Sequence, residues 1–137
     1  MDGVWKRAYE ISYVNGVAVD TTTVPADAVL DLKIIQDGYF MVVVDQTNLI
    51  KDVNDPWHGG FLGYGQIDYD GKGNMVEYNE FGSGAGNINN YPPRNAATGH
   101  YASVSFYADD MYLQITKDTL DRPNPQAGRG VVYRRVQ

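Results

Sequence analysis

The sequence predicts an all-β domain, and three observations support this. Tyrosine (11) and glycine (15) are abundant among the 137 residues, and this composition favours strands over long helices. Apolar side chains recur with a period of two rather than 3.6. Dipeptides typical of tight turns separate these short runs, and only residues 25–29 suggest a short helical turn. We therefore expect consecutive antiparallel hairpins.

The first strand begins near Gly3. One of its faces carries the side chains that we expect to point inward, which are Trp5, Arg7, Tyr9, Ile11 and Tyr13. The other face carries Val4, Lys6, Ala8, Glu10 and Ser12, as expected for a strand with one wet side. Asn15-Gly16 then predicts a type I′ turn, because both residues tolerate positive φ.

Residues 30–34 and 39–44 flank Asp37-Gly38, which predicts a second hairpin. A two-residue turn would pair Gln36 with Tyr39, Ile34 with Met41 and Leu32 with Val43, whereas a bulge at Gly38 would shift one side by a residue. Residues 45–60 are expected to form a connection. Residues 61–69 and 74–81 flank the turn sequence Asp70-Gly71-Lys72-Gly73 and predict a third hairpin.

Residues 100–107 and 111–117 form the clearest pair. A turn centred on Asp109-Asp110 places Ala108 opposite Met111, Phe106 opposite Leu113 and Val104 opposite Ile115. The apolar face, expected to point inward, then contains His100, Ala102, Val104, Phe106, Leu113 and Ile115. A last strand over about 130–136 raises the expected number to eight or nine.

A meander of this many strands removes its exposed edges by closing on itself. We therefore predict that residues 1–137 form one domain, an up-and-down antiparallel β-barrel of about eight strands. The interior of such a barrel is wide enough for its own side chains or for one small ligand.

The two ends of the chain predict how one end of the barrel is closed. Gly3 precedes Trp5 by two residues, and Arg134 and Arg135 lie on the last strand. An indole ring buries a large apolar area, and an arginine over it adds a cation–π contact and donates to terminal carbonyls. Strand parity groups Arg135 with Tyr133, so we expect Gly3, Trp5 and Arg135 to form the plug.

Further family-like features are the Lys33–Phe40 hairpin, Glu77-Tyr78 and the ending Tyr133-Arg134-Arg135-Val136. Together with Gly3 and Trp5, they make the chain resemble the small bacterial lipocalin-like (calycin-type) domains over essentially its whole length. The resemblance implies non-catalytic binding or transport of a small hydrophobic or amphipathic molecule in the barrel, including an anionic one. Related barrels that carry fatty acids hold the head group with arginine and tyrosine. The ligand-binding residues expected here are Arg7, Tyr9, Ile11, Ile34, Met41, Tyr78, Val104 and Phe106.

Arg7 is the charge that needs an explanation, because a buried arginine needs an anionic partner. That partner could be a ligand carboxylate or a carboxylate of the protein such as Glu77, and a solvent-facing bulge at Arg7 is a further alternative. Two segments are candidate portals or mobile insertions, 82–94 within the long 82–99 connection and 121–125.

Two other functions stay open at this stage. The barrel could be filled by its own side chains and act as an interaction or scaffold module through its loops. An isomerase- or cyclase-like enzyme would need an interior tyrosine, histidine or Glu77 as acid or base. Nucleophilic catalysis is poorly supported, because Gly82-Ser83-Gly84 is not a Gly-x-Ser-x-Gly elbow.

The net charge of −6 argues against a nucleic-acid partner, and no apolar run is long enough for membrane insertion. No cofactor or metal site is expected, because cysteine is absent and His58 and His100 lack acidic neighbours at ligand spacing. The pattern begins at residue 3, so we expect a secreted, periplasmic or cell-surface chain trimmed of a leader, with a cytoplasmic location as the alternative. The oligomeric state is left open.

Overall fold

The computed structural model describes residues 1–23, 30–95, 99–108, 110–116 and 129–136, and these residues contain strands and no helix. None of them therefore forms a helix that could cross a membrane. The ten strands are β1 (Gly3–Val14), β2 (Val17–Thr23), β3 (Leu30–Gln36), β4 (Tyr39–Asp45), β5 (Phe61–Tyr69), β6 (Asn74–Gly84), β7 (Asn87–Asn90), β8 (Gly99–Ala108), β9 (Met111–Thr116) and β10 (Arg129–Arg135).

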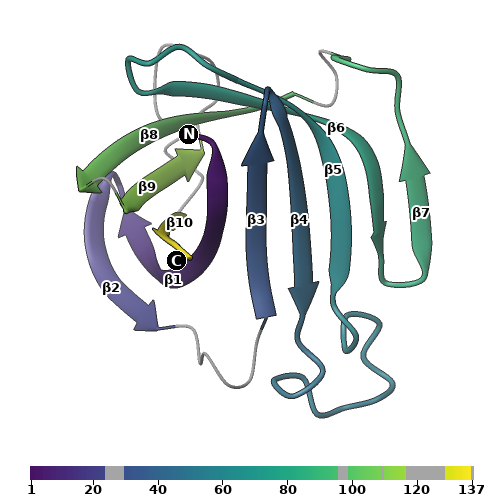
Figure 1. Cartoon of the computed structure of the whole chain (residues 1–137). Helices are drawn as coiled ribbons and strands as arrows, with labels where there is room; N and C mark the ends of the chain where they lie inside the picture. The colour runs from purple at the N-terminus through teal and green to yellow at the C-terminus, as the bar shows by residue number, and fades with distance from the viewer. Residues whose placement is uncertain (24–29, 96–98, 109, 117–128, 137) are drawn as a thin grey trace.

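Eight of these strands close into an antiparallel barrel, which confirms the predicted fold class. The ring runs β1-β3-β4-β5-β6-β8-β9-β10 and is completed where β10 pairs with β1. β2 pairs with the second half of β1, and β7 pairs with the second half of β6 (Figure 1). These two strands lie outside the ring and extend the wall at one end, which we call the mouth.

Short turns at the predicted places join strands that are consecutive in the sequence and paired in the sheet. The φ values are 52° and 80° at Asn15-Gly16, and 51° and 80° at Asp37-Gly38. Both pairs match a type I′ turn. The register of β3 on β4 is the predicted one, with Gln36 opposite Tyr39 and no bulge. Asp70 organises the third hairpin, because its Oδ1 accepts from the Lys72 and Asn74 amides at 2.7 and 3.0 Å.

A bulge in β1 changes which side chains face inward. Arg7 lies opposite Tyr133 but Tyr9 lies opposite Val132, so Ala8 is an extra residue in the pair. A single extra residue reverses the side-chain alternation. The prediction of one inward row from Trp5 to Tyr13 is therefore wrong, since Tyr9 and Ile11 share the outer face with Val132 and Gly130, while Glu10 turns inward.

A second bulge, between Phe106 and Ala108, corrects the predicted register of β8 on β9. Ala108 does lie opposite Met111, as expected. Beyond the bulge, however, Phe106 lies opposite Tyr112 and Val104 opposite Gln114. The predicted inward positions of Leu113 and Ile115 are therefore wrong, and Tyr112 and Gln114 occupy the inner face instead.

The candidate portal that begins at Gly82 is largely strand rather than loop. β6 continues through residues 82–84, turns at Ala85-Gly86 and returns as β7. The other predicted portal, residues 121–125, lies outside the described residues, as does the short turn expected at 25–29.

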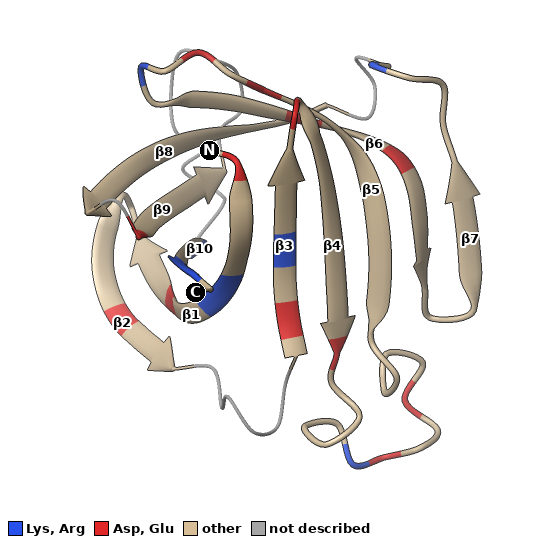
Figure 2. Ribbon diagram, viewed as in Figure 1, with Lys and Arg blue, Asp and Glu red and all other residues tan. Residues whose placement is uncertain are grey.

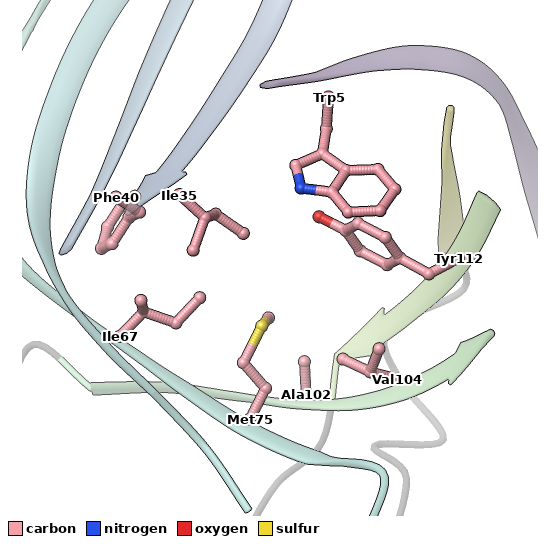
Figure 3. Close-up of a cluster of buried hydrophobic side chains, with 8 residues drawn as sticks. All are labelled: Trp5, Ile35, Phe40, Ile67, Met75, Ala102, Val104 and Tyr112. Atoms are coloured by element: carbon pink, nitrogen blue, oxygen red, sulfur yellow. The ribbon is translucent and has the colours of Figure 1, made fainter. Parts of the chain in front are cut away.

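The hydrophobic core fills the end of the barrel opposite the mouth (Figure 3). Trp5 is fully buried and meets the Tyr112 ring edge-on at a centroid distance of 4.7 Å. Its indole N–H donates to the Met1 carbonyl at 2.9 Å. The other members of this cluster are Ile35, Phe40, Ile67, Met75, Ala102 and Val104.

Arg135 is the arginine that covers Trp5. Its guanidinium carbon lies 4.3 Å from the centre of the ring, and Nη1 donates to the Asp2 carbonyl at 2.8 Å. A side chain at Gly3 would place its Cβ 2.1 Å from Nη1 of Arg135, and φ at Gly3 is 150°. Only glycine leaves room at this position for the guanidinium that lies over the indole.

Candidate functional site

Above the core, the inside of the barrel is occupied by a buried ion pair. Lys33 on β3 is 1% exposed, and its ammonium pairs with Glu77 on β6. Lys33 Nζ also donates to Gln114 Oε1 on β9 at 2.9 Å and lies 5.3 Å from the centre of the Tyr133 ring. Burial lowers the pKa of Lys33 to about 7, because leaving water disfavours the charged form.

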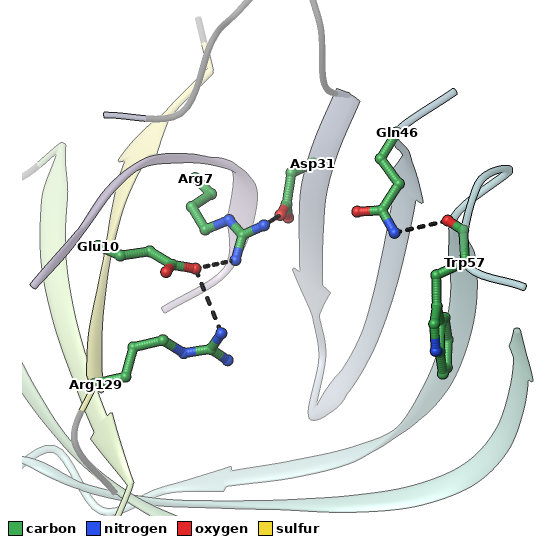
Figure 4. Close-up of polar contacts among 6 residues, drawn as sticks. All are labelled: Arg7, Glu10, Asp31, Gln46, Trp57 and Arg129. Atoms are coloured by element: carbon green, nitrogen blue, oxygen red, sulfur yellow. Dashed lines mark hydrogen bonds and ion pairs between the residues drawn. The ribbon is translucent and has the colours of Figure 1, made fainter. Parts of the chain in front are cut away.

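Arg7 belongs to a second ionic cluster, nearer the mouth (Figure 4). Its two terminal nitrogens contact Asp31 Oδ2 at 2.6 Å and Glu10 Oε1 at 2.5 Å, and Arg129 Nη1 approaches Glu10 Oε1 at 3.5 Å. Burial raises the pKa of Asp31, although the neighbouring Arg7 opposes this. Arg7 therefore points inward as predicted, but protein carboxylates other than Glu77 neutralise it.

The two ionic groups occupy the interior around Arg7, where we expected the charged end of a ligand. Three cations (Arg7, Lys33 and Arg129) lie with three carboxylates (Glu10, Asp31 and Glu77). Removing one partner from a buried pair leaves an uncompensated charge and is strongly destabilising. A ligand that reached this depth would have to displace such a partner, so space for a ligand must lie nearer the mouth.

A groove of about 360 Å³ lies at the mouth, over the inner face of β4, β5, β6 and β7. Its floor is formed by the backbone of Gly63, Gly82 and Gly84. Apolar and aromatic side chains and two amides surround this floor, namely Val42, Trp57, Phe61, Tyr91, Asn79 and Asn89.

The floor is flat because it consists of glycines. A Cβ at Gly84 would lie 2.6 Å from Cζ3 of Trp57, so the indole packs directly on the backbone there. A Cβ at Gly63 would lie 2.9 Å from the Phe81 carbonyl oxygen. A Cβ at Gly82 would meet no atom within 4 Å, so the space above Gly82 is the open part of the groove.

The connection between β4 and β5 holds Trp57 in this position (Figure 4). The Trp57 amide donates to Asp55 Oδ1 at 2.9 Å, and its carbonyl accepts from Gln46 Nε2 at 2.8 Å and from the Gly60 amide at 3.0 Å. His58 Nδ1 contacts the Ile50 carbonyl, so two parts of the connection are held together. The Trp57 ring meets Phe61 at 88° with a centroid distance of 5.9 Å, so the two rings form one wall.

None of the eight predicted ligand-binding residues lines this groove. Val104 belongs to the core cluster, and Phe106 lies edge-on to Trp5 at 6.4 Å. Ile34 and Met41 face each other on the outer surface, because the buried Lys33, Ile35 and Phe40 take the alternate positions. Tyr78 also points outward and lies beneath Arg94, which pairs with Asp68.

The sequence carries only part of the signal for this groove. Trp57 does lie in the connection predicted over residues 45–60, but nothing in its local sequence indicates that it folds back over the sheet. Glycines at 82 and 84 are two apart and so share one face of a strand, a pattern that marks a close approach to the backbone.

Comparison of the chain with protein-family models, with curated proteins and with solved structures finds no significant match.

Proposed function

We propose that this protein binds a small hydrophobic or amphipathic molecule without catalysis, and that the ligand occupies the groove at the mouth of the barrel. The observation that carries this proposal is the aromatic groove of about 360 Å³ over a glycine floor. Pockets that take small molecules are concave, mostly apolar, and hold roughly 300–1,000 Å³. The proposal keeps the function class that the sequence suggested and moves the site outward.

The lining indicates how such a ligand would lie. A flat apolar group fits on the exposed backbone at Gly82, between Val42 and the wall of Trp57 and Phe61. Asn89 offers amide donors and acceptors at the polar side of the groove, beside Asn79. Among the described residues that line the groove there is no cation or carboxylate, which favours a ligand with a neutral polar end.

The test places a bulky side chain on the floor of the groove and measures the binding of a dye. N-phenyl-1-naphthylamine, a neutral amphipathic dye that brightens in apolar surroundings, is titrated into the wild type, Gly82→Leu and Trp57→Ala. Because a side chain at Gly82 meets no protein atom at its base, Gly82→Leu should fold normally and occupy the ligand's space. We expect both variants to weaken dye binding at least tenfold.

Ser105→Leu is the matched control, since it adds the same side chain at an exposed strand position that does not line the groove. It should bind the dye like the wild type. Equal affinity in the wild type and in a folded Gly82→Leu would contradict the proposal. If Gly82→Leu does weaken dye binding, native mass spectrometry of protein from its natural host, before and after organic extraction, would identify the bound molecule.

A second candidate function, self-association, is favoured by a different observation. The outer surface of β3–β7 carries uncharged apolar rows formed by Ile34, Met41, Tyr64 and Phe81 and by Val43, Leu62 and Ile88. Tyr64 and Phe81 stack at 5.4 Å, and Leu62 and Tyr64 are exposed. Two copies of this acidic chain could bring these rows together without placing like charges in contact.

Sedimentation velocity distinguishes this candidate from the first. If the apolar rows form a dimer interface, the wild type should sediment as a dimer at micromolar concentration and Leu62→Lys as a monomer. A monomeric wild type would exclude self-association through this surface and leave the ligand-binding proposal untouched.

A further inference from the structure

A second groove, on the outer surface where β1 meets β10, has an unusual concentration of positive charge. It has a volume of about 430 Å³ and is lined by Lys6, Arg7, Ala8, Thr23, Arg134, Arg135 and Val136. Four of these seven residues are cationic and none is acidic, in a chain whose net charge is −6. Figure 2 shows the basic segments of β1 and β10 side by side.

Two of the four cations are already neutralised or engaged elsewhere. Arg7 reaches inward to Asp31 and Glu10, and Arg135 lies over Trp5 and donates to the Asp2 carbonyl. Lys6 and Arg134 have no carboxylate partner among the residues that the structure describes. Within the described part of the chain, Arg134 makes a polar contact with the Met111 sulfur at 3.7 Å.

Lys6 and Arg134 also lie directly opposite each other in the β1–β10 pair. Side chains at directly opposed positions have Cβ atoms roughly 4.5–5.5 Å apart, and like charges there are destabilising. This pair of like charges is therefore a cost to stability. An anion between the two side chains would remove the repulsion and satisfy both.

We propose that this groove binds an oxyanion, a phosphate or carboxylate group carried on a small organic molecule. The Arg134 guanidinium offers two parallel N–H donors, which suit either oxyanion, and Lys6 supplies a second charge. The Thr23 hydroxyl lies at the rim as a further donor, while Ala8 and Val136 form an apolar flank for the rest of the ligand. This site lies on the outer surface and is separate from the groove proposed for the neutral ligand.

The bulge at Ala8 brings these parts together. The extra residue shifts the side-chain alternation of β1. Before the bulge, Lys6 points outward; after it, β1 pairs with β2, whose last residue, Thr23, lies opposite Tyr9. Without the extra residue, the strand would continue straight, and the concave surface between β2 and β10 would be lost.

The experiment measures binding of inorganic phosphate and of acetate by amide chemical-shift titration at low ionic strength. Lys6→Gln and Arg134→Gln each remove one charge of the pair, and Lys72→Gln removes an exposed charge in the β5–β6 turn as the matched control. We expect phosphate or acetate to shift the amides around Lys6 and Arg134 saturably. Each groove variant should weaken that binding about tenfold, and Lys72→Gln should leave it unchanged.

Thermal unfolding supplies an independent readout. In chloride alone, Lys6→Gln should melt at a higher temperature than the wild type, because it removes the repulsion. Added phosphate should raise the melting temperature of the wild type more than that of Lys6→Gln. If chloride at equal ionic strength produces the same shifts as phosphate and acetate, the effect is general screening and the proposal is wrong. Preference between phosphate and acetate identifies the ligand's acidic group.

Discussion

Lys33 is the residue whose burial has the clearest energetic consequence. Its ammonium is enclosed by Glu77, Gln114 and two aromatic rings, so its charge has left water almost completely. The attraction of nearby carboxylate charge, that of Asp31 included, compensates only part of that loss. Such a group keeps its proton less readily in the folded protein than in the unfolded chain.

This predicts a pH dependence of stability. The folded-state pKa of Lys33 is lowered from 10.5 to about 7, so between these values the unfolded chain binds more protons. The free energy of unfolding should therefore rise with pH over this range, by about 2 kcal/mol between pH 7 and 9. Urea unfolding of the wild type and of Lys33→Met/Glu77→Gln, which lacks both charges, measures the difference.

The window ends at pH 9 because the tyrosines act in the opposite direction above it. Burial raises the pKa of Tyr133 to about 12, so in strong alkali the unfolded chain loses tyrosine protons first and stability falls. A double variant whose stability rises between pH 7 and 9 as much as the wild type would show that Lys33 is not the source.

At the same scale, the sequence predicted single residues better than their partners. Gly3, Trp5 and Arg135 meet as expected, because the size of the indole and the alternation of short strand ends determine that contact. Arg7 points inward, but its carboxylates are Asp31 and Glu10. Glu10 could not be assigned from an unbroken alternation, because the bulge at Ala8 is what turns it inward.

At the scale of the element, turns with asparagine or aspartate before glycine were predictable and the β6–β7 hairpin was not. Its turn, Ala85-Gly86, has φ values of 50° and 78°, the same conformation as at Asn15-Gly16. Alanine adopts positive φ only at a cost, so this dipeptide carries little turn signal. The bulges in β1 and β8 were hidden for a related reason, since an extra residue leaves no mark in local composition.

The strain at Ala85 gives a prediction for this hairpin. Asparagine tolerates positive φ better than alanine, so Ala85→Asn should stabilise the β6–β7 turn by a few tenths of a kcal/mol. Gly86→Val places a β-branched residue at φ 78° and should open the turn. Hydrogen exchange should show slower exchange of the β7 amides in Ala85→Asn and faster exchange in Gly86→Val.

Because β7 lies outside the ring, the amides of β3, β4 and β9 serve as the internal reference and should exchange alike in all three proteins. Global loss of protection in Gly86→Val would contradict the view that the hairpin opens independently of the barrel. Since β7 contributes Asn89 to the mouth groove, the same variant should also weaken dye binding.

At the scale of the whole molecule, closure rests on the contact between the two ends of the chain. β10 pairs with β1 from Trp5–Arg135 to Ser12–Arg129, and the Val136 amide donates to the Val4 carbonyl at 2.8 Å. The overall ring was predictable, because a meander of this many strands has few other ways to cover its edges. The location of the open space was not, since it depends on which interior positions the ion pairs occupy.

The adjacent ends predict that the chain tolerates circular permutation. A short glycine-serine linker can join residues 4 and 136 through their flanking residues. New ends between Gly71 and Lys72 open an exposed turn at the closed end and disturb one hydrogen bond there, from the Lys72 amide to Asp70. This permutant should unfold cooperatively and bind the dye like the wild type. A permutant opened between Val53 and Asn54 should keep the barrel but free the connection that holds Trp57, so its dye affinity should fall. Near-ultraviolet circular dichroism and dye titration of both proteins check this, and loss of cooperative unfolding in the first would mean that closure depends on the original chain order.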